Sequence, residues 1–128
     1  MTAGKVMHLA IVIGIMVLSG GLTFAETGAA SNPDKNPKKQ LLFFMNPNGR
    51  PCQMQDAIIR EMGTSLSDVA TVKYVKTTNR EDYPTFRTYG IRGLPSLIVL
   101  DGKGMELKRF TPGVQSAETI LKGITAGK

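Results

Sequence analysis

The residue best able to do chemistry is Cys52, the only cysteine in the chain. It follows Arg50 and Pro51 and opens the segment CQMQDAIIREM, in which apolar residues recur at helical spacing. An apolar run and the turn-forming residues Asn, Pro and Gly precede it. A thiol in the first turn of a helix lies beside unpaired backbone N–H groups and the positive end of the helix dipole, and both favour the reactive thiolate. Cys52 is therefore the candidate nucleophile.

The residues that would normally assist such a thiol are scarce. The only histidine, His8, precedes the predicted domain, so a Cys–His or Ser–His–Asp catalytic set cannot be built within one chain. A zinc site would lack ligands, and an internal disulfide would lack its second sulfur. We therefore expect no cofactor and no metal, with one alternative, a soft-metal site that joins Cys52 to Met45 or Met54.

Composition fits one compact domain and a short extra segment. The chain has 128 residues, of which 41% are hydrophobic and 20% charged. Its net charge is +6 and its pI about 9.7, but the basic residues are scattered along the sequence. This pattern favours a solvated basic surface, and we expect no nucleic-acid partner.

Residues 1–25 have the pattern of a secretory signal peptide. Lys5 is followed by the continuously apolar run LAIVIGIMVL, and small residues lead to Ala25, where we predict cleavage. The rest of the chain would then be periplasmic or otherwise extracytoplasmic, where disulfide chemistry can occur. The alternative is an uncleaved membrane anchor over residues 6–25. Residues 26–39 are polar and rich in Asn, Pro and Lys, which predicts a flexible linker.

The elements that must position Cys52 are expected in a domain over residues 40–128. Alternating apolar runs, helical periodicities and Gly- or Pro-containing breaks predict strands at 40–45, 70–77, 96–100 and 105–110, and helices from 51 to 63 or 68, at 79–89 and at 116–124. We expect the first helix to bury Met54, Ala57, Ile58, Met62 and Leu66. The first two strands should be parallel with a right-handed crossover, and the final hairpin should add antiparallel strands.

Two segments of this sequence resemble the thioredoxin family. GRPCQMQDAIIREM is similar to the family's active-site turn and helix, which begin with Cys-Gly-Pro-Cys. YGIRGLPSLIVLDGKG is similar to the stretch Tyr-Gly-Ile-Arg-Gly-Ile-Pro-Thr, which carries the family's cis-proline. The resemblance implies a three-layer α/β fold with a mixed sheet of about four strands and helices on both faces. The family's N-terminal β-α unit has no counterpart here.

The resemblance also assigns roles to individual residues. Pro51 falls at the motif proline, Cys52 at the second cysteine and Pro95 at the cis-proline, while Leu94 would hold an extended substrate segment. Gly49 stands where the first, nucleophilic cysteine belongs. The usual dithiol cycle, in which the first sulfur attacks and the second resolves the mixed disulfide, cannot run without that residue.

Two functional interpretations remain. In the first, Gly49 leaves the sulfur exposed, Arg50 stabilises its thiolate, and Cys52 exchanges with protein or small-molecule thiols and disulfides or links two chains in a dimer. In the second, Cys52 is buried, and the protein is a non-redox binding or adaptor module.

Overall fold

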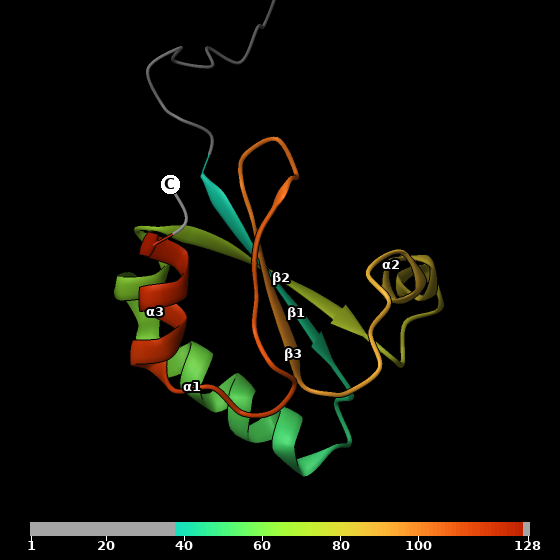
Figure 1. The fold of residues 1–128 in the computed structure, drawn as a ribbon. Helices are drawn as coiled ribbons and strands as arrows, with labels where there is room; N and C mark the ends of the chain where they lie inside the picture. Colours follow the sequence, from blue (N-terminus) through green and yellow to red (C-terminus); the bar gives the residue numbers. More distant parts are fainter. Residues whose placement is uncertain (1–37, 127–128) are drawn as a thin grey trace, which may run out of the picture. The chain divides into compact units, whose positions relative to one another are not determined.

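The computed structural model describes residues 38–126, which form a mixed four-stranded sheet covered by helices on both faces (Figure 1). The strands are β1 (Lys39–Met45), β2 (Ala70–Lys76), β3 (Ser96–Leu100) and β4 (Glu106–Arg109), and their order across the sheet is β2-β1-β3-β4. β1 is parallel to β2 and antiparallel to β3, and β4 is antiparallel to β3. The predicted element order and strand directions are therefore confirmed.

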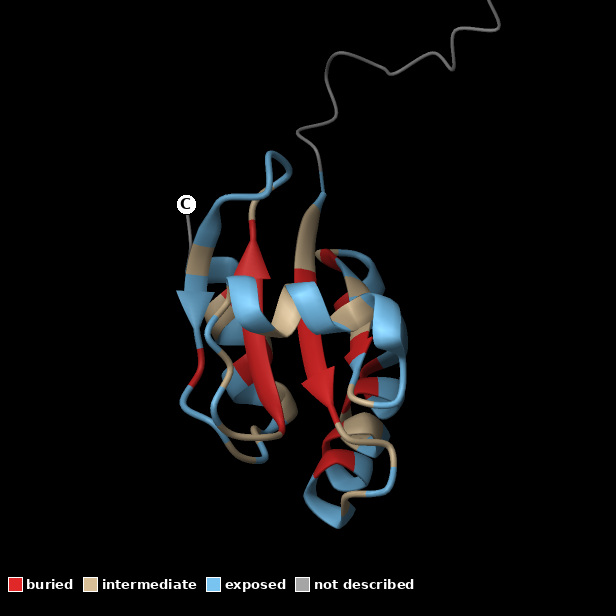
Figure 2. Ribbon diagram, turned by 90° about the vertical axis from the view of Figure 1, so that its right-hand side faces the viewer, coloured by how far each residue is buried: buried red, intermediate tan, exposed pale blue. Residues whose placement is uncertain are grey.

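The two central strands are buried because their sequences are apolar on both faces. Every residue of β3 is buried, as are the last five residues of β1. Strands that are covered on both sides read as continuous hydrophobic runs, which is the pattern of LLFFM and SLIVL. Figure 2 shows β1 and β3 as the buried centre of the sheet and β4 as an exposed edge.

Helices α1 (Arg50–Ser67) and α3 (Ala117–Ala126) cover one face of the sheet. The 3₁₀ turn η1 (Arg80–Asp82) and helix α2 (Tyr83–Thr88) lie on the opposite side (Figure 1). The hydrophobic core accordingly has two clusters, one between the sheet and helices α1 and α3, and one between the sheet and α2. In the second cluster the Phe44 and Phe86 rings meet edge to face, with centroids 5.3 Å apart. The sheet thus separates two apolar layers.

The buried face of α1 differs from the predicted one. The buried residues are Cys52, Gln55, Ile59, Met62 and Leu66, so only Met62 and Leu66 of the expected set are buried. Met54 is 53% exposed, Ala57 is exposed and Ile58 is half-buried. The true stripe follows spacings of three and four residues from Cys52, which places Met54 and Ala57 to one side of it.

Element boundaries differ by small amounts. Lys39, the last residue of the predicted linker, already belongs to β1, and the single helix predicted at 79–89 is a 3₁₀ turn followed by α2. α1 continues to Ser67, but Gly63 interrupts it with φ 48° and ψ −123°. Glycine tolerates this conformation because it has no Cβ.

Predictions for the N-terminal segment fall outside the described residues. These are the signal peptide, its alternative as a membrane anchor, and the linker up to residue 37. Within residues 38–126, the structure contains no helix that is long and apolar enough to span a membrane.

Candidate functional site around Cys52 and Pro95

A tight turn between β1 and α1 positions Cys52. The Gly49 N–H donates to the Asn46 carbonyl at 2.9 Å, and the Asn48 N–H donates to the Asn46 side-chain oxygen at 3.0 Å. Gly49 is the N-cap of α1, and Pro51 lies in the first turn, where a missing N–H costs nothing. Cys52 therefore lies in the first turn of α1, as predicted.

The sulfur is covered, which contradicts the expectation that Gly49 leaves it exposed. Cys52 is only 2% exposed and belongs to the cluster under α1 and α3. Its Sγ accepts a hydrogen bond from the Asn46 N–H at 3.3 Å. A Cβ at position 49 would lie 3.7 Å from this sulfur. The absent side chain would thus have faced the sulfur, but the turn itself and the core already bury Cys52.

Arg50 does not engage the thiol. Arg50 and Pro51 are both exposed, and within residues 38–126 Arg50 makes no side-chain hydrogen bond or ion pair. Of the two methionines in the soft-metal alternative, Met54 is exposed and is not brought to the buried sulfur, whereas Met45 lies in the same buried cluster as Cys52. Direct electrostatic help to a thiolate is limited to the Asn46 N–H and the helix end.

Pro95 lies at the same end of the sheet as this turn. The last residue pair between β1 and β3 is Phe44 and Ser96, so the antiparallel register brings Leu94 and Pro95 beside the residues that follow β1. The peptide bond between Leu94 and Pro95 is cis, and Pro95 is fully buried. Its carbonyl accepts a hydrogen bond from the Gly113 N–H at 2.9 Å. The Cys52 turn, the Pro95 turn and the segment around Gly113 thus meet at one site.

Leu94 precedes Pro95 at this site, and its backbone has no hydrogen-bond partner among the described residues. Its side chain packs against both core clusters, but within residues 38–126 its N–H and C=O make no hydrogen bond. The backbone groups on either side are engaged, because the Ser96 hydroxyl donates to the Gly93 carbonyl at 2.6 Å and Pro95 accepts from Gly113. Partly buried backbone groups generally find partners, so Leu94 is suited to pair with an extended chain.

The sequence analysis missed Gln55, whose hydrogen bonds hold the segment that follows Gly113 beside the site. It is fully buried on α1, accepts from the Gln115 N–H at 2.6 Å and donates to the Gln115 carbonyl at 3.1 Å. This pair of bonds holds the segment that carries Val114, which is 39% exposed. Gln55 lies three residues after Cys52 and four before Ile59, and this spacing on an apolar stripe is the sequence signal that could have identified it.

A second polar network joins α1 to β2. The Tyr74 hydroxyl donates to one Asp56 carboxylate oxygen at 2.9 Å, and Arg60 contacts the other at 2.9 Å. Burial, the hydrogen bond to Asp56 and the charge of that carboxylate raise the pKa of Tyr74. Lys76 lies over the Tyr74 ring, 5.7 Å from its centroid, and both Lys73 and Lys76 are exposed. The network orders α1 without reaching the sulfur.

Comparison with known proteins identifies the fold. No protein-family model matches the sequence, and no curated protein matches it. Among solved structures, thioredoxin-2 of the malaria parasite, described as a component of its protein secretion machinery, shares 18% identity, with a TM-score of 0.61 over 70% of this chain and 82% of that one. StoA from Bacillus subtilis shares 18% identity, with a TM-score of 0.57 over 69% and 83% of the two chains. Spinach chloroplast thioredoxin f shares 20% identity, with a TM-score of 0.59 over 72% and 78%. The chain therefore has a thioredoxin-like fold.

Proposed function

We propose that this protein is a non-redox binding module, which holds an extended segment of a partner protein at Leu94 and Pro95. The observation that carries the proposal is the unpaired backbone of Leu94, beside the turn that follows β1, within the described residues. A backbone carbonyl of an extended segment would accept a hydrogen bond from the Leu94 N–H. A backbone N–H of the same segment would donate to the Leu94 carbonyl, as in recognition by strand addition.

The residues around Leu94 favour binding of a peptide over thiol–disulfide exchange. The neighbouring Val114 is an exposed apolar side chain, and Arg50 and Arg92 from the two flanking turns are also exposed. A sulfur that attacks a disulfide must approach it in line, and Cys52 at 2% exposure offers no such approach in the folded state. Among the described residues no second thiol exists to resolve a mixed disulfide.

The test is a titration of the full chain, labelled with ¹⁵N, with a carboxymethylated, permanently unfolded protein as probe. We expect amide shifts to concentrate at Gly93, Leu94 and the turn after β1. Cys52→Ser should bind the probe as well as the natural chain does, because the sulfur is not a contact. Loss of binding in Cys52→Ser, with the fold intact, would contradict the proposal.

A matched pair of surface variants locates the contact. Val114→Glu places a charge beside Pro95, whereas Met105→Glu places the same charge in the hairpin turn at the other end of β3. Both side chains are exposed, at 39% and 66%, so neither change should unfold the protein. We expect Val114→Glu alone to weaken binding. Equal effects of the two variants would place the peptide elsewhere.

The second candidate is monothiol exchange through Cys52, favoured by the hydrogen bond from the Asn46 N–H to Sγ. Such a bond stabilises a thiolate. The thiolate would attack one sulfur of a partner disulfide, the S–S bond would break, and the other sulfur would leave as a thiolate, so one mixed disulfide replaces one disulfide. Reduction of insulin by dithiothreitol tests this function. Rates at the level of Cys52→Ser would exclude it, and faster rates would support it.

We also propose export from the cytoplasm, on the strength of the apolar run and the small residues that lead to Ala25. The intact mass of the protein isolated without reductant tests this proposal. A mass that lacks residues 1–25 supports cleavage. A full-length mass recovered with the membrane fraction supports the anchor, and a full-length mass in the cytoplasmic fraction contradicts export. The same spectrum shows any adduct or disulfide-linked dimer at Cys52.

A further inference from the structure

Within residues 38–126, no strand pairs with the outer edge of β4. β4 is the last strand in the order β2-β1-β3-β4. The Phe110 N–H bonds to the Leu97 carbonyl at 3.0 Å, and Arg109 is opposite Ile98. Because hydrogen-bonding direction alternates along an antiparallel strand, the backbone N–H and C=O of Arg109 face away from β3. Unpaired edges of this kind accept further strands.

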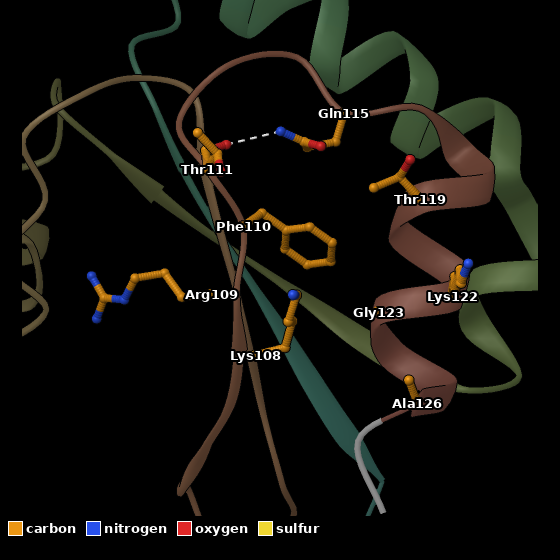
Figure 3. A pocket seen from close by; sticks show the side chains of 9 residues that line it. All are labelled: Lys108, Arg109, Phe110, Thr111, Gln115, Thr119, Lys122, Gly123 and Ala126. Carbon is orange, nitrogen blue, oxygen red and sulfur yellow. Dashed lines mark hydrogen bonds between the residues drawn. The ribbon is translucent and has the colours of Figure 1, made fainter.

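Beside this edge lies a groove of about 490 Å³ between β4 and α3 (Figure 3). The Phe110 ring enters it from the strand, toward the α3 segment that contains Gly123. A Cβ on Gly123 would clash with this ring, approaching its Cε1 to 2.8 Å. The glycine therefore allows the ring to sit against the helix.

The groove is positively charged. Lys108 extends into it from β4, and Lys122 lies on the facing helix (Figure 3). Within residues 38–126 neither lysine forms an ion pair, and the ammonium group of Lys108 lies over the Phe110 ring, with Nζ 5.9 Å from its centroid. Among the described residues no carboxylate lines the groove, and its other polar side chains are Thr111, Gln115 and Thr119. Arg109 turns away, because it bonds Glu106 and the Tyr89 carbonyl.

We propose that an extended acidic segment of a partner protein adds to β4 as a further strand, with acidic side chains between Lys108 and Lys122. The open backbone supplies the pairing, and two lysines without carboxylate partners supply the charge complementarity. A second copy of this chain suits the groove less well, because it would bring its own copies of Lys108 and Arg109 toward the two lysines. The groove adjoins the surface at Leu94 through the segment that contains Thr111 and Gln115.

The experiment titrates the full chain with a short peptide of alternating Glu and Val. Amide shifts should follow β4 and α3, and the peptide should bind less tightly as salt is raised. Lys122→Glu should weaken binding about fivefold or more, since an attractive pair becomes a repulsive one. Lys103→Glu, the same change in the exposed hairpin turn, should have a smaller effect. Equal effects of the two variants would overturn the proposal.

Two further probes separate strand addition from charge alone. A peptide of the same charge with alternate backbone amides methylated cannot pair along one edge, so it should lose binding. Polyphosphate should bind more weakly than the Glu–Val peptide. Undiminished binding of the methylated peptide, tighter binding of polyphosphate, or a dimer through β4 that excludes the peptide would each contradict an acidic strand as the occupant.

Discussion

The sulfur of Cys52 accepts a hydrogen bond from Asn46 at 3.3 Å and is closed off from solvent. The position that faces it is Gly49, whose added Cβ would lie 3.7 Å from Sγ. Two sulfurs are thus geometrically compatible with this turn, although the chain carries one. At the scale of single residues, a side chain at position 49 would face the sulfur of Cys52.

Gly49→Cys should therefore create an internal disulfide with Cys52. Gly49 has φ −86° and ψ 123°, which any residue can adopt, and the added Cβ meets only the Asn46 carbonyl closely, at 3.3 Å. On oxidation we expect the intact mass to fall by two hydrogens and both thiols to resist alkylation. Lys103→Cys in the remote hairpin turn is the control and should keep its free thiol. Two free thiols in oxidised Gly49→Cys would refute the predicted geometry.

Gln55→Leu tests the buried amide that holds the segment of Gln115. The change removes two hydrogen bonds and leaves the Gln115 N–H and C=O without their partner. We expect a loss of about 1–3 kcal/mol in the free energy of unfolding, measured with urea.

Gln53→Leu is the matched control on the same helix. Gln53 is exposed and bonds the Pro47 carbonyl at 2.9 Å. Its replacement should cost about 0.5 kcal/mol or less. Similar losses in both variants would show that Gln55 has no special structural role.

At the scale of elements, the local sequence pattern predicted most of the helices and strands correctly. It did not predict which face of α1 is buried. The strand at 96–100 was predicted to the residue because four consecutive apolar residues follow Ser96, and the segment is bounded by Pro95 and Asp101. For α1, two apolar stripes compete, and the buried one contains a glutamine. Only its tertiary partner, Gln115, satisfies that amide, and no local pattern reveals a partner 60 residues away.

Packing of α3 on β4 gives a prediction at this scale. Gly123→Ala would raise helix propensity by about 1 kcal/mol. The new methyl group, however, would overlap the Phe110 ring. We expect a net loss of about 1–3 kcal/mol in the free energy of unfolding from overpacking. In the Phe110→Leu background the same change should be neutral or stabilising. A loss of equal size in both backgrounds would contradict the proposed clash.

At the scale of the whole molecule, the strand directions and both helical layers could be predicted, but the strand order and the exposure of the site could not. The parallel crossover and the hairpin fix the directions, whereas only the structure shows that the hairpin joins β1 and not β2. Whether a thiol at a helix start is covered depends on how the turn, the sheet and the first helix close on one another. Leu41, Phe43 and Leu97 in the same cluster contribute to that closure.

The stability of the fold should also depend on Tyr74 at alkaline pH. Its pKa is raised in the folded state, so its contribution is fully present below the unfolded value of about 10 and is lost as pH rises through the folded value. Tyr74→Phe has no hydroxyl to titrate, so its free energy of unfolding should not show this loss at alkaline pH. The difference in the free energy of unfolding between the two proteins should be constant below about pH 10 and shrink above it.

Asp56→Asn is the control for this pH dependence. It removes the carboxylate that accepts from Tyr74, and with it part of the raised pKa. The alkaline loss should still begin near the unfolded value of about 10, but it should be smaller than in the natural protein. Identical alkaline profiles for the natural protein, Tyr74→Phe and Asp56→Asn in urea unfolding would contradict the assignment.

The most direct test of a binding module with a covered thiol is the rate of alkylation of Cys52 by iodoacetamide, measured across a urea series. A sulfur at 2% exposure should react only when the protein opens, so the rate should rise in step with the unfolded fraction. Rapid alkylation near pH 6 in the absence of urea would contradict this account, because it would show a thiol that is both accessible and acidic in the folded protein.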